Sequence, residues 1–226
     1  MAQLLDQVLG NASGIIGTLV FRIRKGANFI SRKPSPRSSP LGLDEIAFRS
    51  KFGLAGKIAS GINSIKELNE CWPKSTSRAS KCNLIFKANY KIINSAENFG
   101  SVAVVPAFGF NTVNAVLTAG VAGIHLVTDA LGVDVGIDTS IEKFIVAAGV
   151  VVLQTPTLED IDATQVIAFK TTRHNLDLIN PVDLSAAFAG GSLAMYDSYT
   201  DKKVFACLVT LDDAGKAIRY SCTVHS

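Results

Sequence analysis

The sequence predicts an α+β fold in which a β-hairpin and a pair of helices precede a mainly antiparallel β-sandwich. Three observations predict it. Apolar and polar residues alternate over 19–24, apolar residues recur every three or four positions over 44–97, and short runs rich in Val, Ala, Thr, Ile and Phe follow Gly100. We therefore divide the chain of 226 residues into a β-hairpin with a basic arm (1–42), a helical hairpin (43–100) and a β-sandwich (101–226).

The chain opens with a predicted hairpin and an extended arm. In "IIGTLVFRIR", Leu19, Phe21 and Ile23 share one face of a strand, whereas Arg22 and Arg24 lie on the other. "KGAN" then forms the turn and "FISRK" the returning strand. The segment "PSPRSSP" has three prolines in seven residues and no apolar side chain, which favours an extended, polyproline-like arm without a core of its own.

Two antiparallel helices are expected next. Apolar residues recur at helical spacing from Phe48, and the carboxylates of Asp44 and Glu45 suit a helix N-terminus. We expect this helix over 44–71, with its glycines as places where it can bend and Pro73 beyond its end. The capping residues of "KSTSRASK" begin a second helix, which continues to about residue 97.

The region after Gly100 contains eight short β-like runs separated by Gly, Asp, Asn and Pro. Their spacing favours a sandwich over alternating strands and helices. Around the last turn, "LDDAGK", a symmetric pairing places Cys207 opposite Tyr220 and Cys222 opposite Phe205. "DTSIEKF" has the pattern of a capping box, which leaves a short helix near 139–146 as an alternative to a strand. The expected runs are 102–105, 112–118, 121–128, 143–153, 164–171, 182–188, 204–211 and 217–224.

Charge is divided sharply along the chain. Residues 1–91 carry fifteen Lys and Arg against five Asp and Glu, a net charge of +10. Residues 92–226 carry seven against fourteen, a net charge of −7. Such asymmetry favours contact with nucleic acid, with an acidic surface, or with the acidic half of another copy of the chain.

The chain is apolar, and the sequence predicts that protein contacts cover the excess. Hydrophobic residues make up 48% of it and its mean hydropathy is +0.30. The longest strongly apolar run, 144–153, falls short of the roughly 20 residues that a membrane-spanning helix needs. No basic segment precedes the first apolar residues, so we predict no secretory signal. These observations favour a subunit buried in an assembly.

The sequence predicts no metal, cofactor or disulfide framework. The four cysteines, Cys71, Cys82, Cys207 and Cys222, have neither CxxC nor Cys-His spacing, so we interpret them as reduced, partly buried thiols. The acidic segments "DVGIDTS" and "LEDIDAT" lack the ligand pattern of a calcium loop and are predicted to be turns and strand caps.

Catalytic residues are not predicted either. His125, His174 and His225 lie far apart in the sequence, and "GGSLA" lacks the second glycine of a nucleophile elbow. Gly14 and Gly17 are not followed by the Lys-Ser/Thr of a phosphate loop. We interpret them as strand glycines that allow another backbone to approach closely.

The order of these features resembles a family of uncharacterised proteins, a domain of unknown function found in Bacteroidota and related phages. The resemblance is carried by the Gly-x-x-Gly of Gly14 and Gly17, "FRIRKG", "SRKPSP", and "RSKF" at 49–52. It covers about residues 14–60, and the final hairpin is similar only in pattern. It implies that the C-terminal sandwich is immunoglobulin-like or fibronectin-like. It implies no activity.

The basic residues of the hairpin, the arm and the first helix are the predicted binding residues. Spaced guanidinium groups on an extended backbone can follow phosphates, and an extended arm can equally pair with carboxylates of a neighbouring subunit. A solvated surface is the plain alternative, and we favour the subunit contact. The set comprises Arg22, Arg24, Lys25, Arg32, Lys33, Arg37, Arg49 and Lys51.

We therefore expect a non-enzymatic structural protein of a large assembly, namely a phage virion component such as a capsid-associated, head-tail joining or tail protein. Its expected partners are other copies of itself, other assembly subunits and, as an alternative, packaged nucleic acid. Its expected location is the virion, assembled in the bacterial cytoplasm. Two alternatives stay open: a bacterial immunoglobulin-like surface binding module, and a sequence-independent nucleic-acid-binding protein.

Overall fold

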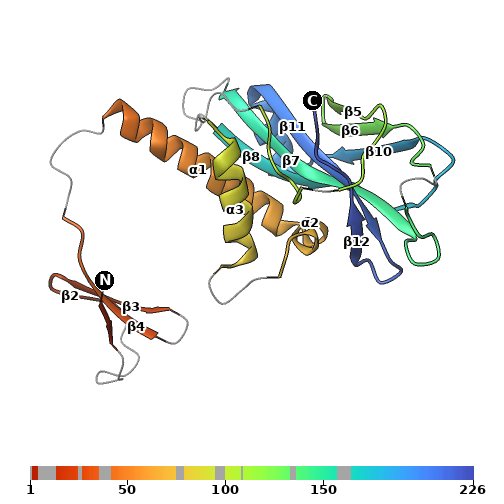
Figure 1. Ribbon diagram of the computed structural model, residues 1–226. Coiled ribbons are helices and arrows are strands. Elements are labelled where there is room, and N and C mark those ends of the chain that lie inside the picture. The colour runs from red at the N-terminus through yellow and green to blue at the C-terminus, as the bar shows by residue number, and fades with distance from the viewer. Residues whose placement is uncertain are drawn as a thin grey trace. The chain divides into compact units, whose positions relative to one another are not determined.

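The computed structural model divides the chain into two compact units, an N-terminal unit, Met1–Gly42, and a main unit, Leu43–Ser226. Each unit is described by itself (Figure 1). The structure describes residues 2–4, 14–24, 27–35, 42–74, 79–94, 100–107, 109–132, 136–156 and 164–226.

The N-terminal unit is a four-stranded antiparallel sheet in the order β1-β4-β3-β2. β3 and β4 occupy the place of the expected first hairpin and pair in register, with Arg24 opposite Ala27. The tip of that hairpin, 25–26, and most of the proline arm, 36–41, lie outside the described residues. The strands are β1 (Ala2–Leu4), β2 (Gly14–Ile16), β3 (Leu19–Arg24) and β4 (Ala27–Arg32).

The main unit begins with α1 (Leu43–Ser64), α2 (Lys66–Cys71) and α3 (Lys81–Ile92). The helix expected over 44–71 is therefore interrupted at Ile65, whose extended backbone separates α1 from α2, and not at one of its glycines. Ser80 caps α3 by accepting a hydrogen bond from the Asn83 N–H at 3.3 Å. α3 ends at Ile92, earlier than predicted, because Ile93 has an extended backbone and is buried in the core.

Two antiparallel sheets follow. The larger has the order β12-β11-β7-β8, with β13 also pairing with β11 and β9 with β7. The smaller has the order β10-β6-β5. Together with the helices, these sheets confirm the α+β class. The strands are β5 (Val116–Ala119), β6 (Gly123–Thr128), β7 (Phe144–Pro156), β8 (Thr164–Lys170), β9 (His174–Asn175), β10 (Val182–Ala187), β11 (Tyr199–Leu211), β12 (Ala217–Tyr220) and β13 (Val224–His225).

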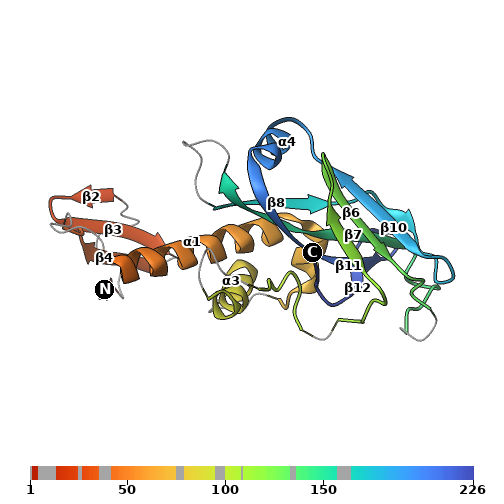
Figure 2. The same cartoon turned by 90° about the horizontal axis from the view of Figure 1, so that it is seen from above.

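The larger sheet is the middle layer of the main unit. Helices α1–α3 cover one of its faces, and the smaller sheet lies on the other (Figures 1 and 2). Alternate residues of β7 serve the two sides: Val150 and Val152 pack toward the helices, and Val151 and Leu153 toward the smaller sheet. Burial on both faces explains why 144–153 is an almost continuous apolar run. Since the helices and the strands share this core, 43–100 and 101–226 form one compact unit.

Residues 102–105 were expected to form a strand, but the structure has irregular chain there. Side chains, and not a neighbouring strand, form hydrogen bonds with the backbone groups of this segment. The Asn89 side chain accepts from the Ala103 N–H at 2.9 Å and donates to its carbonyl at 3.0 Å, and Trp72 Nε1 donates to the Val104 carbonyl at 3.1 Å. The valines in this segment are buried nonetheless.

Three further expectations are corrected. Residues 139–141 form a turn, and β7 begins at Phe144 in place of a short helix near 139–146. In the last hairpin, Val209 and not Cys207 lies opposite Tyr220, because the turn takes one residue more than the symmetric pairing assumes and a β-bulge after Thr210 adds a further shift of one. β13 pairs with β11 in a register of its own and places His225, in place of Cys222, opposite Phe205. The segment containing "GGSLA" is a helix, α4 (Gly190–Asp197), which the sequence pattern does not predict.

Candidate interaction surfaces

The basic residues expected to bind a partner do not form a single line. Within the N-terminal unit, Arg22 lies opposite Phe29 and Arg32 opposite Leu19. Cross-strand partners share a face and successive residues alternate, so the two arginines project from opposite faces of the sheet. Both are exposed, as is Lys33. The side chain of Arg24 and the whole of Lys25 and Arg37 lie outside the described residues.

The other two predicted binding residues belong to the main unit and make local contacts on α1. Arg49 Nη2 lies 2.8 Å from Glu45 Oε1, one helical turn away, in an exposed ion pair. Lys51 Nζ lies 4.5 Å from the centre of the Tyr90 ring. An exposed pair of this kind stabilises a helix by only about 0.3–0.5 kcal/mol. Neither contact draws the charged group of Arg49 or Lys51 into the buried core.

A cluster of aromatic rings joins the first half of α1 to α3. Phe52 lies 4.8 Å from Phe86 between ring centroids, Phe86 stacks on Tyr90 at 5.6 Å, and Phe48 meets Tyr90 edge-on at 6.2 Å. Phe48 and Phe52 are nevertheless 58% and 54% exposed. The cluster therefore has an inner side that packs on α3 and an outer side that faces solvent.

Two more apolar residues near the start of α1 are exposed, but they lie on other sides of the helix, since Ile46 is two residues from Phe48 and such side chains do not face each other. Leu43 is 86% exposed and Ile46 is 45% exposed. We call the two exposed rings that share one face, Phe48 and Phe52, the α1 apolar patch. The second half of the same helix is different, because Leu54, Ile58 and Ile62 are buried against the larger sheet. Helical periodicity places Phe48 and Phe52 on the same stripe as Ile58 and Ile62 and does not show where the covering layer ends, so the sequence pattern alone does not reveal this patch.

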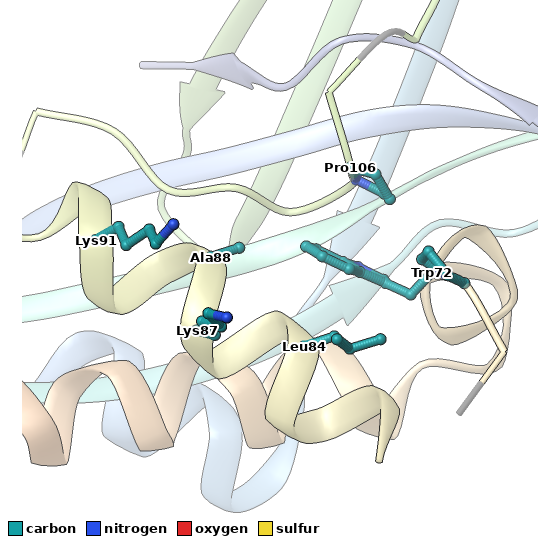
Figure 3. A pocket seen from close by; sticks show the side chains of 7 residues that line it. Trp72, Leu84, Lys87, Ala88, Lys91 and Pro106 are labelled. Atoms are coloured by element: carbon teal, nitrogen blue, oxygen red, sulfur yellow. The ribbon is translucent and has the colours of Figure 1, made fainter. Parts of the chain in front are cut away.

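A groove with an apolar floor lies on the other side of α3 (Figure 3). Trp72, Leu84, Ala88 and Pro106 form its floor and walls, and its volume is about 260 Å³. Lys87 and Lys91, one turn apart on α3, stand at its rim and are exposed. The Trp72 side chain is only 6% exposed and is fixed by its hydrogen bond to Val104. This groove suits an apolar group that carries a negative charge.

The histidines make separate contacts. His125 Nε2 lies 2.5 Å from Asp183 Oδ1 on the exposed face of the smaller sheet. Ser185 lies opposite His125 in the register. In the described part of the chain, however, no hydrogen bond joins that serine to the histidine, as activation of a nucleophile would require. His174 lies 3.3 Å from Thr172 Oγ1, and His225 stacks on Phe205.

All four cysteines are free thiols. Burial is the main cause that raises the pKa of Cys71 to about 12, with a smaller contribution from the nearby carboxylate of Glu70. Burial also raises the pKa of Cys207 well above its ordinary value. Both groups are therefore poor nucleophiles near neutral pH. Among the described residues, no group of three or more His, Cys, Asp or Glu side chains is arranged to hold a metal ion.

No protein-family model, curated protein or solved structure matches this chain. Within the described residues, no helix is long and apolar enough to cross a membrane.

Proposed function

We infer that this protein is a non-enzymatic structural subunit of a large assembly, namely a phage virion component of the capsid-associated, head-tail joining or tail type, assembled in the bacterial cytoplasm. The observation that carries this proposal is the α1 apolar patch, because the neighbouring aromatic side chains of Phe48 and Phe52 lie more than half exposed beside a well-packed core. Contiguous apolar surface rimmed by polar residues is typical of protein interaction sites. The phage assignment rests on the resemblance of residues 14–60.

We propose that the α1 apolar patch contacts a second copy of the chain. Arg49 and Lys51 flank it, and both stand in the half of the sequence with a net charge of +10. The other half, residues 92–226, has a net charge of −7. A contact between the patch of one copy and the acidic half of the next combines apolar burial with charge complementarity. Contacts between unlike surfaces build rings or open arrays, as a large assembly requires.

The two-unit organisation supports the same function. Residues 1–42 form a compact unit of their own, separate from the main unit. A separate unit of this kind can contact a neighbouring subunit while the main unit contacts another. In an assembly, two linked units that each bind a neighbour hold the subunit more firmly than either contact alone.

A second candidate function is a binding module of the immunoglobulin class. If the two-residue β9 and β13 are set aside, the first, second and fifth strands of the main unit form one sheet, β5-β6-β10. The third, fourth, sixth and seventh form the other, β8-β7-β11-β12. In immunoglobulin domains strands A, B and E likewise share one sheet and C, F and G the other. This order supports an immunoglobulin-like or fibronectin-like sandwich, in which helices α1–α3 cover the outer face of the second sheet.

Sedimentation velocity of the purified full-length protein tests the assembly proposal. Over a concentration series at low salt, we expect species larger than the monomer, in proportions that rise with concentration. Salt at 1 M shortens the screening length to about 3 Å, so it should weaken the charged part of the contact. A protein that remains monomeric at every concentration in both salts would refute self-assembly and leave the binding module as the better proposal.

A further inference from the structure

We propose that the free edge of β8 accepts β2 of a second copy as an additional strand. This inference rests on the proposed assembly function, since it identifies a surface through which subunits would join. It concerns a different part of the main unit from the α1 apolar patch. Strand addition supplies main-chain hydrogen bonds for affinity and alternate side-chain pockets for specificity.

β8 has one partner strand and one free edge. It ends the larger sheet, and among the described strands it pairs with β7 alone. The Thr171 N–H donates to the Ala147 carbonyl at 2.9 Å, so odd-numbered residues of this segment direct their backbone groups toward β7. Even-numbered residues therefore direct theirs outward. The Thr164 carbonyl accepts from Lys57 Nζ at 2.7 Å, which agrees with this alternation. The backbone groups of Val166 and Ala168 are left at the open edge.

Grooves flank this edge on both faces of the sheet. On the α1 side, Ser60, Gly61 and Ser64 line a groove of about 370 Å³ together with Val166 and Ala168, and the missing side chain of Gly61 lets α1 pack closely on that strand. On the α4 side, Gly191, Ser192 and Met195 leave a groove of about 540 Å³ beside the same strand. Figure 2 shows β8 with α1 and α4 nearby. A strand added here would direct alternate side chains into the two grooves, so it should be apolar on both of its faces.

β2 has that character. Ile15 and Ile16 are 60% and 70% exposed, and as neighbours in a strand they point to opposite faces. β2 is also an edge strand, paired with β3 alone among the described strands. At Gly14, a φ of 127° is one that L side chains rarely adopt, and among the described residues nothing lies within 4 Å of where a Cβ would stand. The start of β2 is therefore accessible to another backbone.

Opposite net charge favours contact between the N-terminal unit of one copy and the main unit of another. Residues 1–42 contain six basic residues and one acidic residue, a net charge of +5. Residues 43–226 contain sixteen basic and eighteen acidic residues, a net charge of −2. The N-terminal unit of one copy is therefore attracted to the main unit of the next.

Amide hydrogen exchange of isotope-labelled full-length protein provides the test. In dilute, monomeric protein, the amides of Val166 and Ala168 should exchange at least about tenfold faster than those of Gln165 and Ile167, which face β7. At a concentration where the protein associates, Val166 and Ala168 should become protected by at least about tenfold. Gln165 and Ile167 serve as the internal control, because they are paired in both states.

Two variants identify donor and acceptor. Ile15→Asp/Ile16→Asp disables β2 as donor, and in this protein Val166 and Ala168 should remain unprotected. Ala168→Pro removes an outward N–H that the sheet does not use, so it should fold and still block strand addition. Gly191→Trp, which fills the α4-side groove, is a second acceptor variant. When unlabelled Ala168→Pro protein is added to the labelled donor variant, protection of Val166 and Ala168 should return.

The outcomes separate this inference from the proposed function. Protection in the wild type, its loss in the donor variant and its return in the mixture would establish strand exchange between copies. Association without protection of Val166 and Ala168 would overturn the inference and leave the assembly function standing. Protection that persists in the donor variant would also overturn it, because another segment would then occupy the edge. A wild type that never associates would overturn both.

Discussion

The buried carboxylate of Glu142 lies 3.0 Å from Nε of Arg219, whose own side chain is 47% exposed. Glu142 also accepts hydrogen bonds from the Asp138 N–H at 3.1 Å and from the Thr210 hydroxyl. The pair fastens β12 to the segment that precedes β7. Its two members are not equivalent, because the arginine can reach water and the carboxylate, which is 1% exposed, cannot.

This asymmetry predicts which substitution costs more. Arg219→Met strands a buried negative charge and should lower the free energy of unfolding by about 3 kcal/mol. Glu142→Gln keeps an acceptor for Asp138 and leaves Arg219 able to be solvated, so it should cost only about 1–2 kcal/mol. The double variant should be more stable than Arg219→Met alone. Urea unfolding at pH 7 measures all three, and a double variant less stable than Arg219→Met would refute the account.

Gly149, in the middle of β7, is predicted to tolerate no side chain. A Cβ there would stand 2.0 Å from the carbonyl oxygen of Phe205, which belongs to the backbone of β11 and cannot turn aside. Gly149→Ala should therefore lower the free energy of unfolding by about 3 kcal/mol or more, or prevent folding.

Gly53 provides the matched control. It lies within α1, and a Cβ there would meet nothing within 4 Å. Gly53→Ala should raise the free energy of unfolding by about 0.5–1 kcal/mol, because alanine is the better helix former. Equal effects of the two alanine substitutions in thermal unfolding would contradict the packing described for β7.

The thiol of Cys71 is predicted to be unreactive while the protein is folded. Burial raises its pKa from an ordinary value near 9 to about 12, so at pH 8 its thiolate fraction falls roughly 10³-fold. Alkylation by iodoacetamide, followed by peptide mass spectrometry, should label Cys71 far more slowly in native than in guanidinium-unfolded protein. A native rate within about tenfold of the unfolded rate would exclude this burial.

The same pKa shift predicts a dependence of stability on pH. Below pH 9 the thiol is protonated in both the folded and the unfolded chain, and its contribution to stability is fully present. As the pH rises from 9 toward 12, only the unfolded chain loses the proton, so that contribution is lost. Unfolding free energies of the wild type and Cys71→Ala should therefore diverge above pH 9, with the wild type falling more steeply. Parallel curves would contradict the prediction.

The sequence predicts the strands and helices whose apolar pattern agrees with the faces that are buried in the structure. It does not predict segments whose conformation depends on contacts with residues far away in the sequence. The apolar run 144–153 predicts a strand, and two-sided burial makes it the central one. Residues 102–105 have the same local character, yet Asn89 and Trp72 satisfy their backbone and no strand forms. α4 begins with two glycines, which are poor helix formers, so only its packing through Tyr196 fixes it.

The candidate surfaces were harder to predict than the fold. The basic residues are visible in the sequence, but alternation along β3 and β4 places Arg22 and Arg32 on opposite faces. The α1 apolar patch has the same periodicity as the buried half of its helix. It becomes visible only when the structure shows that the larger sheet does not cover Phe48 and Phe52.

The central claim is that the α1 apolar patch joins copies of the chain, and sedimentation equilibrium of three proteins tests it most directly. The wild type should self-associate. Phe48→Ser/Phe52→Ser should raise the dissociation constant at least about tenfold, since each large apolar side chain at a contact contributes about 1.5–3 kcal/mol. Val121→Ser, which alters a 94% exposed apolar residue outside the patch, should leave it unchanged. Equal dissociation constants for all three proteins would contradict the claim.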